Sequence, residues 1–198
     1  MGRRRKSRKT KKQADQSRNQ WRNIIIGGAI VVGIIGLGYL LFTNINGPPP
    51  PEEIAGVVDH EHQERDHVDD EVEAGDLPPV GGIHSPEWQN CGIYDEPISI
   101  ENAVHSLEHG AMWLTYQPDL PQEEVDALRE AVRGEASVIM SPYPGLKSPV
   151  VLTAWETQLE LDSVEDERLT EFVDRYQQGP TTPERGATCQ GGVGTPIQ

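Results

Sequence analysis

The sequence lacks most of the patterns that identify an enzyme. Its glycine-rich run, Gly191-Gly192-Val193-Gly194, comes at the end of the chain, without the strand and helix that a nucleotide site requires. No set of nucleophile, base and acid stands out beyond one His-x-x-Glu-His pattern, and we find no internal repeat. We therefore expect neither nucleotide chemistry nor an enzyme.

Charged residues are absent from Ile24 to Phe42, a run of 19 residues in which Tyr39 is the most polar. As a helix this run would be roughly 28 Å long, close to the ~30 Å hydrocarbon core of a bilayer. A cleaved signal peptide has a shorter apolar region and an Ala-x-Ala-like cleavage site, which the sequence does not show here. Residues 24–42 are therefore expected to be a single, retained transmembrane helix.

Acids are scarce before this helix, and cations are scarce after it. Ten of the 17 lysines and arginines lie in residues 1–23, where Asp15 is the only acid, so that this tail carries a net charge of +9. Beyond the helix, seven cations face 31 acids. The positive-inside rule then predicts a basic cytoplasmic tail and an acidic extracytoplasmic part, in the cell membrane.

The basic tail also favours contact with anionic lipid headgroups. Nucleic-acid binding is the rival interpretation of such a run. Trp21 is the only aromatic residue of the tail, and it suits the membrane interface. We expect the lipid bilayer as a partner, and no nucleic acid.

Cysteine occurs only twice, as Cys91 and Cys189, both on the outer side of the expected membrane helix. An oxidising compartment permits a disulfide between them, which would tie down the glycine-rich end of the chain. Closing a loop of about a hundred residues would stabilise the domain by up to ~4–5 kcal/mol in the chain-entropy model. The alternative is that Cys91 is a thiolate ligand of a metal.

The part beyond the membrane is expected to divide into three. Residues 43–76 form a linker, in which Pro48–Pro51 favours an extended conformation. The acidic end of this linker, residues 52–76, has almost no large apolar side chains and is expected to have little structure of its own. Residues 77–189 form the folded domain and residues 190–198 a flexible tail.

Hydrophobic periodicity predicts an α+β domain that begins with long loops rich in glycine and proline. Strands are expected at 111–116, 137–140 and 150–155, and helices at 121–133 and 166–176. This order implies two helices packed on a small, mostly antiparallel sheet.

Histidines form the densest group of residues that could carry chemistry. His84, His105 and His109 fall within 26 residues. On one helical turn, His105 and His109 would lie on the same face, because positions four apart are neighbours. Two such imidazoles can share a metal ion, with His84 as a third ligand. The alternative is a hydrogen-bonded polar cluster that orders the loops.

Copper fits this expected ligand set better than zinc, because Met112 and Met140 would add thioether sulfur to the imidazoles. The alternative for each methionine is packing in the core. Residues 105–109 also spell His-x-x-Glu-His, a pattern in which two histidines bind zinc and the glutamate activates water. Gly110 follows at once and leaves no room for a long active-site helix. We therefore expect Glu108 to fix an imidazole tautomer, with a zinc hydrolase as a lesser alternative.

Three runs, PPVGGIHSPEWQNCGIYDEP, NAVHSLEHGAMWLTYQPDLP and SPYPGLKSPVVLTAW, carry a resemblance to a known family. They resemble the uncharacterised bacterial family called domain of unknown function 3105, over most of residues 57–189. The His-x-x-Glu-His-Gly core and the upstream Gly-x-His are the most specific motifs of this resemblance. His67-Val68 also matches a His-Val pair upstream in the family. Members commonly read Pro-Pro-Thr-Ser-Gly-Pro-His where this chain has Pro78 to His84. The resemblance implies a shared site and no particular reaction.

Two functions remain open from the sequence. The first is a membrane-anchored extracytoplasmic domain that binds copper, or alternatively zinc, for metal handling or electron transfer near a larger membrane complex. The second is a structural accessory subunit of a respiratory or photosynthetic assembly. The first predicts metal in the purified protein, and the second predicts copurifying subunits regardless of metal.

Overall fold

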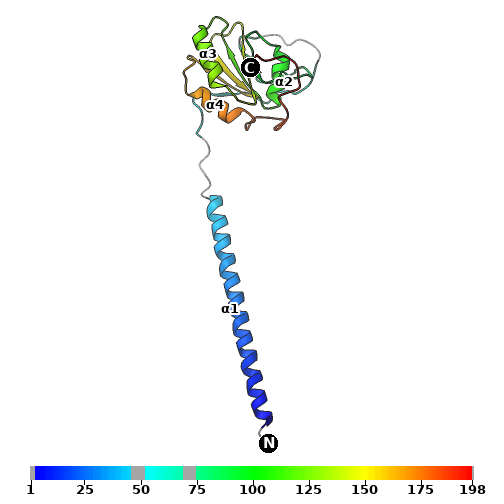
Figure 1. Cartoon of the computed structure of the whole chain (residues 1–198), viewed down its shortest axis with the longest axis vertical. Coiled ribbons are helices and arrows are strands. Elements are labelled where there is room, and N and C mark those ends of the chain that lie inside the picture. The colour runs from blue at the N-terminus through cyan, green and yellow to red at the C-terminus, as the bar shows by residue number, and fades with distance from the viewer. Residues whose placement is uncertain (1–2, 46–51, 69–74, 198) are drawn as a thin grey trace. The chain divides into compact units, whose positions relative to one another are not determined.

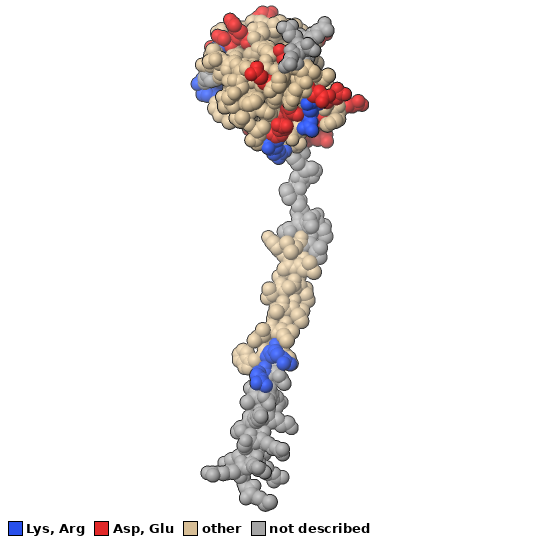
Figure 2. All heavy atoms as spheres, turned by 90° about the vertical axis from the view of Figure 1, so that its right-hand side faces the viewer, with Lys and Arg blue, Asp and Glu red and all other residues tan. Residues whose placement is uncertain are grey.

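The computed structural model describes residues 3–45, 52–68 and 75–197, which divide between two compact units, Met1–Glu52 and Glu53–Gln198. The first unit contains the helix α1 (Arg3–Ile45). Its stretch Gln20–Leu40, with a mean hydropathy of 2.1, is long and apolar enough to cross a membrane. Figure 2 shows a segment of α1 without charged side chains that ends in a group of cations. The tetraproline at 48–51 lies outside the described residues.

The second unit is built on a six-stranded sheet with the order β1-β6-β5-β3-β4-β2. The strands are β1 (Val58–Asp59), β2 (Gly92–Ile93), β3 (Met112–Tyr116), β4 (Val138–Pro142), β5 (Val150–Ala154) and β6 (Thr157–Leu161). Three of the neighbouring pairs are antiparallel, and the pairs that β4 makes with β2 and β3 are parallel. The predicted α+β fold with a mostly antiparallel sheet is confirmed.

Helices cover both faces of this sheet, as Figure 1 shows. They are α2 (Ile100–Glu108), α3 (Gln122–Ala131) and α4 (Arg168–Tyr176). Because side chains alternate along a strand, Trp113 of β3 packs in one buried cluster with Leu107 of α2, and Leu114 packs in another with Leu128 of α3 and Phe172 of α4. The sheet therefore separates two cores, and α2 alone among the three helices packs in the core that contains Trp113.

The helix α2, which was not among the expected elements, has ordinary start and stop signals. Ser99 caps its first turn by accepting a hydrogen bond from the backbone N–H of Asn102, and Glu101 in that turn complements the helix dipole. The helix ends at Glu108 because Gly110, with φ of +94°, takes the left-handed conformation that glycine adopts without strain. The five expected strands and helices are all observed, with small shifts at their ends.

The folded unit begins earlier than the expected boundary at residue 77. β1 pairs with β6, Ile54 is buried, and His67 forms an isolated parallel bridge with His84. Residues 53–68, expected to be part of an unstructured linker, therefore belong to the domain. Their composition is too polar to form a core of their own, and pairing of their backbone groups with the sheet orders them instead.

The C-terminal residues also pack on the domain instead of forming a free tail. Val193 bridges to Gln89, and the backbone N–H of Ile197 donates to the carbonyl of Ile93 over 2.8 Å. Cys91 and Cys189 form a disulfide with their Cα atoms 5.4 Å apart. The predicted disulfide is confirmed, and it excludes Cys91 as a thiolate ligand.

Candidate metal centre

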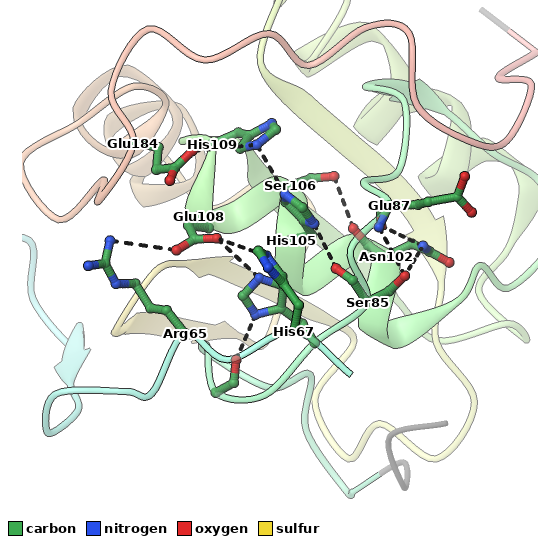
Figure 3. Close-up of polar contacts among 12 residues, drawn as sticks. Arg65, His67, Ser85, Glu87, Asn102, His105, Ser106, Glu108, His109 and Glu184 are labelled. Carbon is green, nitrogen blue, oxygen red and sulfur yellow. Dashed lines mark hydrogen bonds and ion pairs between the residues drawn. The ribbon is translucent and has the colours of Figure 1, made fainter. Parts of the chain in front are cut away.

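A cluster of histidines and one glutamate lies where the end of α2 meets three other segments of the chain. The helix supplies His105, Glu108 and, at its C-cap, His109, all less than 8 % exposed. A fully buried His84 comes from the loop before β2, and His67 comes from the segment that follows β1. Figure 3 shows His67, His105, Glu108 and His109 pointing into the same region.

Three of these imidazoles are held in one tautomer by backbone carbonyls. The Nδ1 atoms lie close to carbonyl oxygens, of Gly82 for His84 (2.7 Å), of Ser85 for His105 (2.7 Å) and of Thr188 for His109 (2.8 Å). A carbonyl oxygen only accepts, so each Nδ1 must donate its hydrogen. In the neutral ring the Nε2 atom is then left with a free lone pair.

These free Nε2 atoms face other acceptors at short distances. Nε2 of His105 lies 3.1 Å from Nε2 of His109, and Nε2 of His84 lies 3.1 Å from Oε2 of Glu108. Two lone pairs repel each other unless a proton or a cation lies between them. Neighbouring ligands of a tetrahedral ion with bonds of about 2.0–2.1 Å are roughly 3.3 Å apart, so both pairs have the spacing of metal ligands.

Four donors form a compact group, His67, His84, His105 and Glu108, whose ligand atoms all lie within 4.8 Å of one another. Nε2 of His67 is 3.8 Å from Oε2 of Glu108. The side chain of His67 is 46 % exposed, whereas those of His84 and Glu108 are buried, so the group opens to solvent on the side of His67. His67 was not among the predicted ligands, although its match to the His-Val pair of the resembling family was a signal.

Burial keeps one of these rings neutral. Desolvation is the main reason why the pKa of His105 is lowered from 6.5 to about 4. The hydrogen bond to the backbone of Ser85 raises this pKa, whereas repulsion from His109, His84 and His67 lowers it further. Because imidazole must be neutral to coordinate a metal, His105 is in its binding form at neutral pH.

Glu108 is placed differently from the prediction that it fixes a tautomer. Backbone carbonyls do that for His84, His105 and His109, whereas Oε2 of Glu108 lies at the free nitrogen of His84. Its other oxygen, Oε1, is 3.6 Å from the guanidinium of Arg65, which is 47 % exposed. The carboxylate therefore stands among the donors themselves.

The structure does not bring the two methionines to this cluster. Met112 and Met140 are fully buried in the core that contains Leu128 of α3 and Phe172 of α4, on the opposite face of the sheet from α2. They pack as core residues, which was the alternative interpretation of each. Trp88 instead lies beside the histidines, with its ring 5.0 Å from that of His109.

Residues 67–191 match the family described as "Protein of unknown function (DUF3105)". This region contains His67, His84, His105, Glu108 and His109, and both cysteines. No curated protein and no solved structure matches the chain.

Proposed function

The chain belongs to the DUF3105 family, and we propose that its second unit binds a divalent transition-metal ion through the cluster of His67, His84, His105 and Glu108. The helix α1 anchors this domain to the membrane, with the domain outside the cytoplasm. The function is metal handling at the membrane surface.

The observation that carries the proposal is the set of fixed tautomers. Backbone carbonyls hold the Nδ1 hydrogens of His84, His105 and His109, so that three buried Nε2 lone pairs point into one cluster. A cluster that only ordered loops would pair these nitrogens with donors or hold protons between them. Here they meet a carboxylate and each other, which a bound cation stabilises.

The donor atoms favour an ion of intermediate softness. Imidazole nitrogen with carboxylate oxygen suits Cu(II) and Zn(II), whereas Cu(I) prefers thiolate and thioether sulfur. The sulfur atoms considered from the sequence are in the core, as Met112 and Met140, or in the disulfide, as Cys91. We therefore propose Cu(II), which binds such sites more tightly than Zn(II), and transfer or storage of the ion in place of electron transfer.

Two features support the orientation. Residues 1–23 carry a net charge of +9 beside the apolar stretch of α1, and such tails stay in the cytoplasm and contact anionic lipids. The disulfide between Cys91 and Cys189 is of the kind that persists in oxidising compartments. Both features support the proposal that the second unit lies on the extracytoplasmic side.

The test measures metal bound to the full chain, purified in detergent and dialysed against a weak chelator. We expect copper in the wild type, and clearly less of it in His105→Ala. His60→Ala is the matched control, because His60 is exposed and lies outside the cluster, and it should keep its copper. Near-zero copper and zinc in all three proteins would contradict the proposal and favour a loop-ordering role in an accessory subunit.

A further inference from the structure

We propose that the cluster holds two metal ions, one between His67, His84 and Glu108, and a second between His105, His109 and Glu184. This inference rests on the proposed function, because it concerns the same site. It adds His109 and Glu184 as ligands, assigns His105 to the second ion and changes the number of ions.

Two separate pairs of acceptors each need a proton or a cation between their atoms, and a metal ion in each pair would meet that need. His84 faces Glu108 at 3.1 Å, and His105 faces His109 at 3.1 Å. The compact group whose ligand atoms lie within 4.8 Å of one another includes His105 but not His109. Ligands of a single ion with bonds of about 2.0–2.1 Å are at most roughly 4.2 Å apart. These four donors together with His109 therefore occupy more space than one coordination sphere, and two ions about 3.5–4 Å apart would match it.

The donors divide into two sets of the same composition. In the first, Oε2 of Glu108 lies 3.1 Å from Nε2 of His84 and 3.8 Å from Nε2 of His67. In the second, Nε2 of His109 lies 3.1 Å from Nε2 of His105 and 3.8 Å from Oε2 of Glu184. Each set has two imidazoles and one carboxylate, a combination that binds divalent transition metals.

The chain holds Glu184 beside His109 through several contacts. The side chain of Gln178 donates to the carbonyl of His109 over 2.7 Å, and the backbone N–H of Glu184 donates to the carbonyl of Glu108 over 3.0 Å. The carbonyl of Thr188 then accepts the Nδ1 hydrogen of His109. Residues 178–188 thus wrap around the end of α2, and Figure 3 shows the carboxylate of Glu184 turned toward His109.

The charge of the domain suits a second cation. Two divalent ions carry four positive charges. Two carboxylates neutralise only two of them, and neutral imidazoles none, so the occupied site would have an excess of positive charge. That excess would lie in the part of the chain after the membrane helix, where seven cations face 31 acids. The side chains of His67 and Glu184, 46 % and 52 % exposed, also leave both positions open to water.

The experiment is equilibrium dialysis of the full chain in detergent against Zn(II), followed by elemental analysis. We expect two zinc ions per chain in the wild type and one in Glu184→Gln, which removes the charge from an exposed side chain. Glu171→Gln, an exposed glutamate of α4, is the control and should keep two. One ion or none in the wild type would overturn this inference. One ion would leave the proposed function standing, whereas absence of both zinc and copper would overturn the proposed function as well.

Electron paramagnetic resonance of the Cu(II)-loaded protein tests the distance between the ions. With one equivalent of Cu(II) we expect the signal of an isolated ion. With two equivalents the ions should couple, and the integrated signal should fall below that of two isolated ions. Two uncoupled signals of full intensity would place the second ion elsewhere and overturn the inference.

Discussion

The carbonyl oxygen of Thr188 accepts the Nδ1 hydrogen of His109 over 2.8 Å, and the residue after Thr188 is Cys189 of the disulfide. The disulfide to Cys91 therefore helps to hold the Thr188 carbonyl in place. Because this carbonyl accepts the Nδ1 hydrogen, Nε2 of His109 keeps a free lone pair. The disulfide and the orientation of the His109 ring are therefore coupled through the backbone of Thr188.

The first prediction concerns this coupling. Cys91→Ser/Cys189→Ser should lower the free energy of unfolding by up to ~4–5 kcal/mol, because the disulfide closes a loop with a sequence separation of 98 residues. It should also weaken metal binding, since the segment that contains Thr188 is then held by hydrogen bonds alone, such as that from the backbone N–H of Cys91 to the carbonyl of Cys189. Thermal unfolding and zinc titration of the double variant and the wild type check both effects. Unchanged metal affinity in a destabilised variant would contradict the coupling.

The second prediction concerns pH and the metal-free protein. The pKa of His105 is lowered to about 4 in the folded state, from a reference of 6.5. Between these values the unfolded chain binds a proton that the folded protein does not, so the contribution of His105 to the free energy of unfolding should fall as pH drops from 6.5 to 4 and change no further below. Denaturant titrations across this range, compared with His105→Gln, measure the contribution. An equal slope in both proteins would contradict it.

The third prediction concerns Arg65, whose guanidinium lies 3.6 Å from Oε1 of Glu108. This positive charge opposes a cation bound to the same carboxylate. Arg65→Met should therefore raise metal affinity several-fold, as measured by competition with a coloured chelator. Arg133→Met, on the surface beyond the end of α3, is the control and should leave the affinity unchanged. A lower affinity in Arg65→Met would mean that Arg65 mainly holds the segment that carries His67.

The fourth prediction concerns Gly110, which ends α2 with φ of +94°. A Cβ atom there would come within 2.7 Å of Thr182 and 2.8 Å of Gln178, in the segment that carries Glu184. Gly134 has a similar φ of +85°, but a Cβ there would meet nothing within 4 Å. Gly134→Ala should cost about 1 kcal/mol of backbone strain, and Gly110→Ala clearly more. Equal unfolding free energies for the two variants would show that the segment moves aside freely.

The fifth prediction concerns topology. Because the cations are concentrated before the apolar stretch, a protease added to intact cells or spheroplasts should digest the second unit. Detection of the N-terminal tail after digestion serves as the control, since the tail should be protected. Digestion only after lysis would show that the orientation is reversed.

Local features of the sequence determined much of the fold. The apolar run gave the helix that could span a membrane, because a bilayer requires about 20 apolar residues in succession. Periods of two and of 3.6 residues located β3, β4, β5, α3 and α4, since these periods reflect which side chains one element buries. The spacing of His105 and His109 placed their rings together, because positions four apart are neighbours on a helix.

The tertiary structure alone decided which distant residues complete the cluster. His67 reaches it through backbone pairing with His84, and Glu184 reaches it through a chain segment held to the end of α2. The tertiary structure also decided the position of Met112. The sequence showed that side chains alternate along β3, but not which face of the sheet Met112 lies on, and α2 and α4 cover opposite faces. Periodicity records only neighbours a few residues apart. The contacts of His67 with His84, across 17 residues, and of His109 with Thr188, across 79, depend on how whole elements pack.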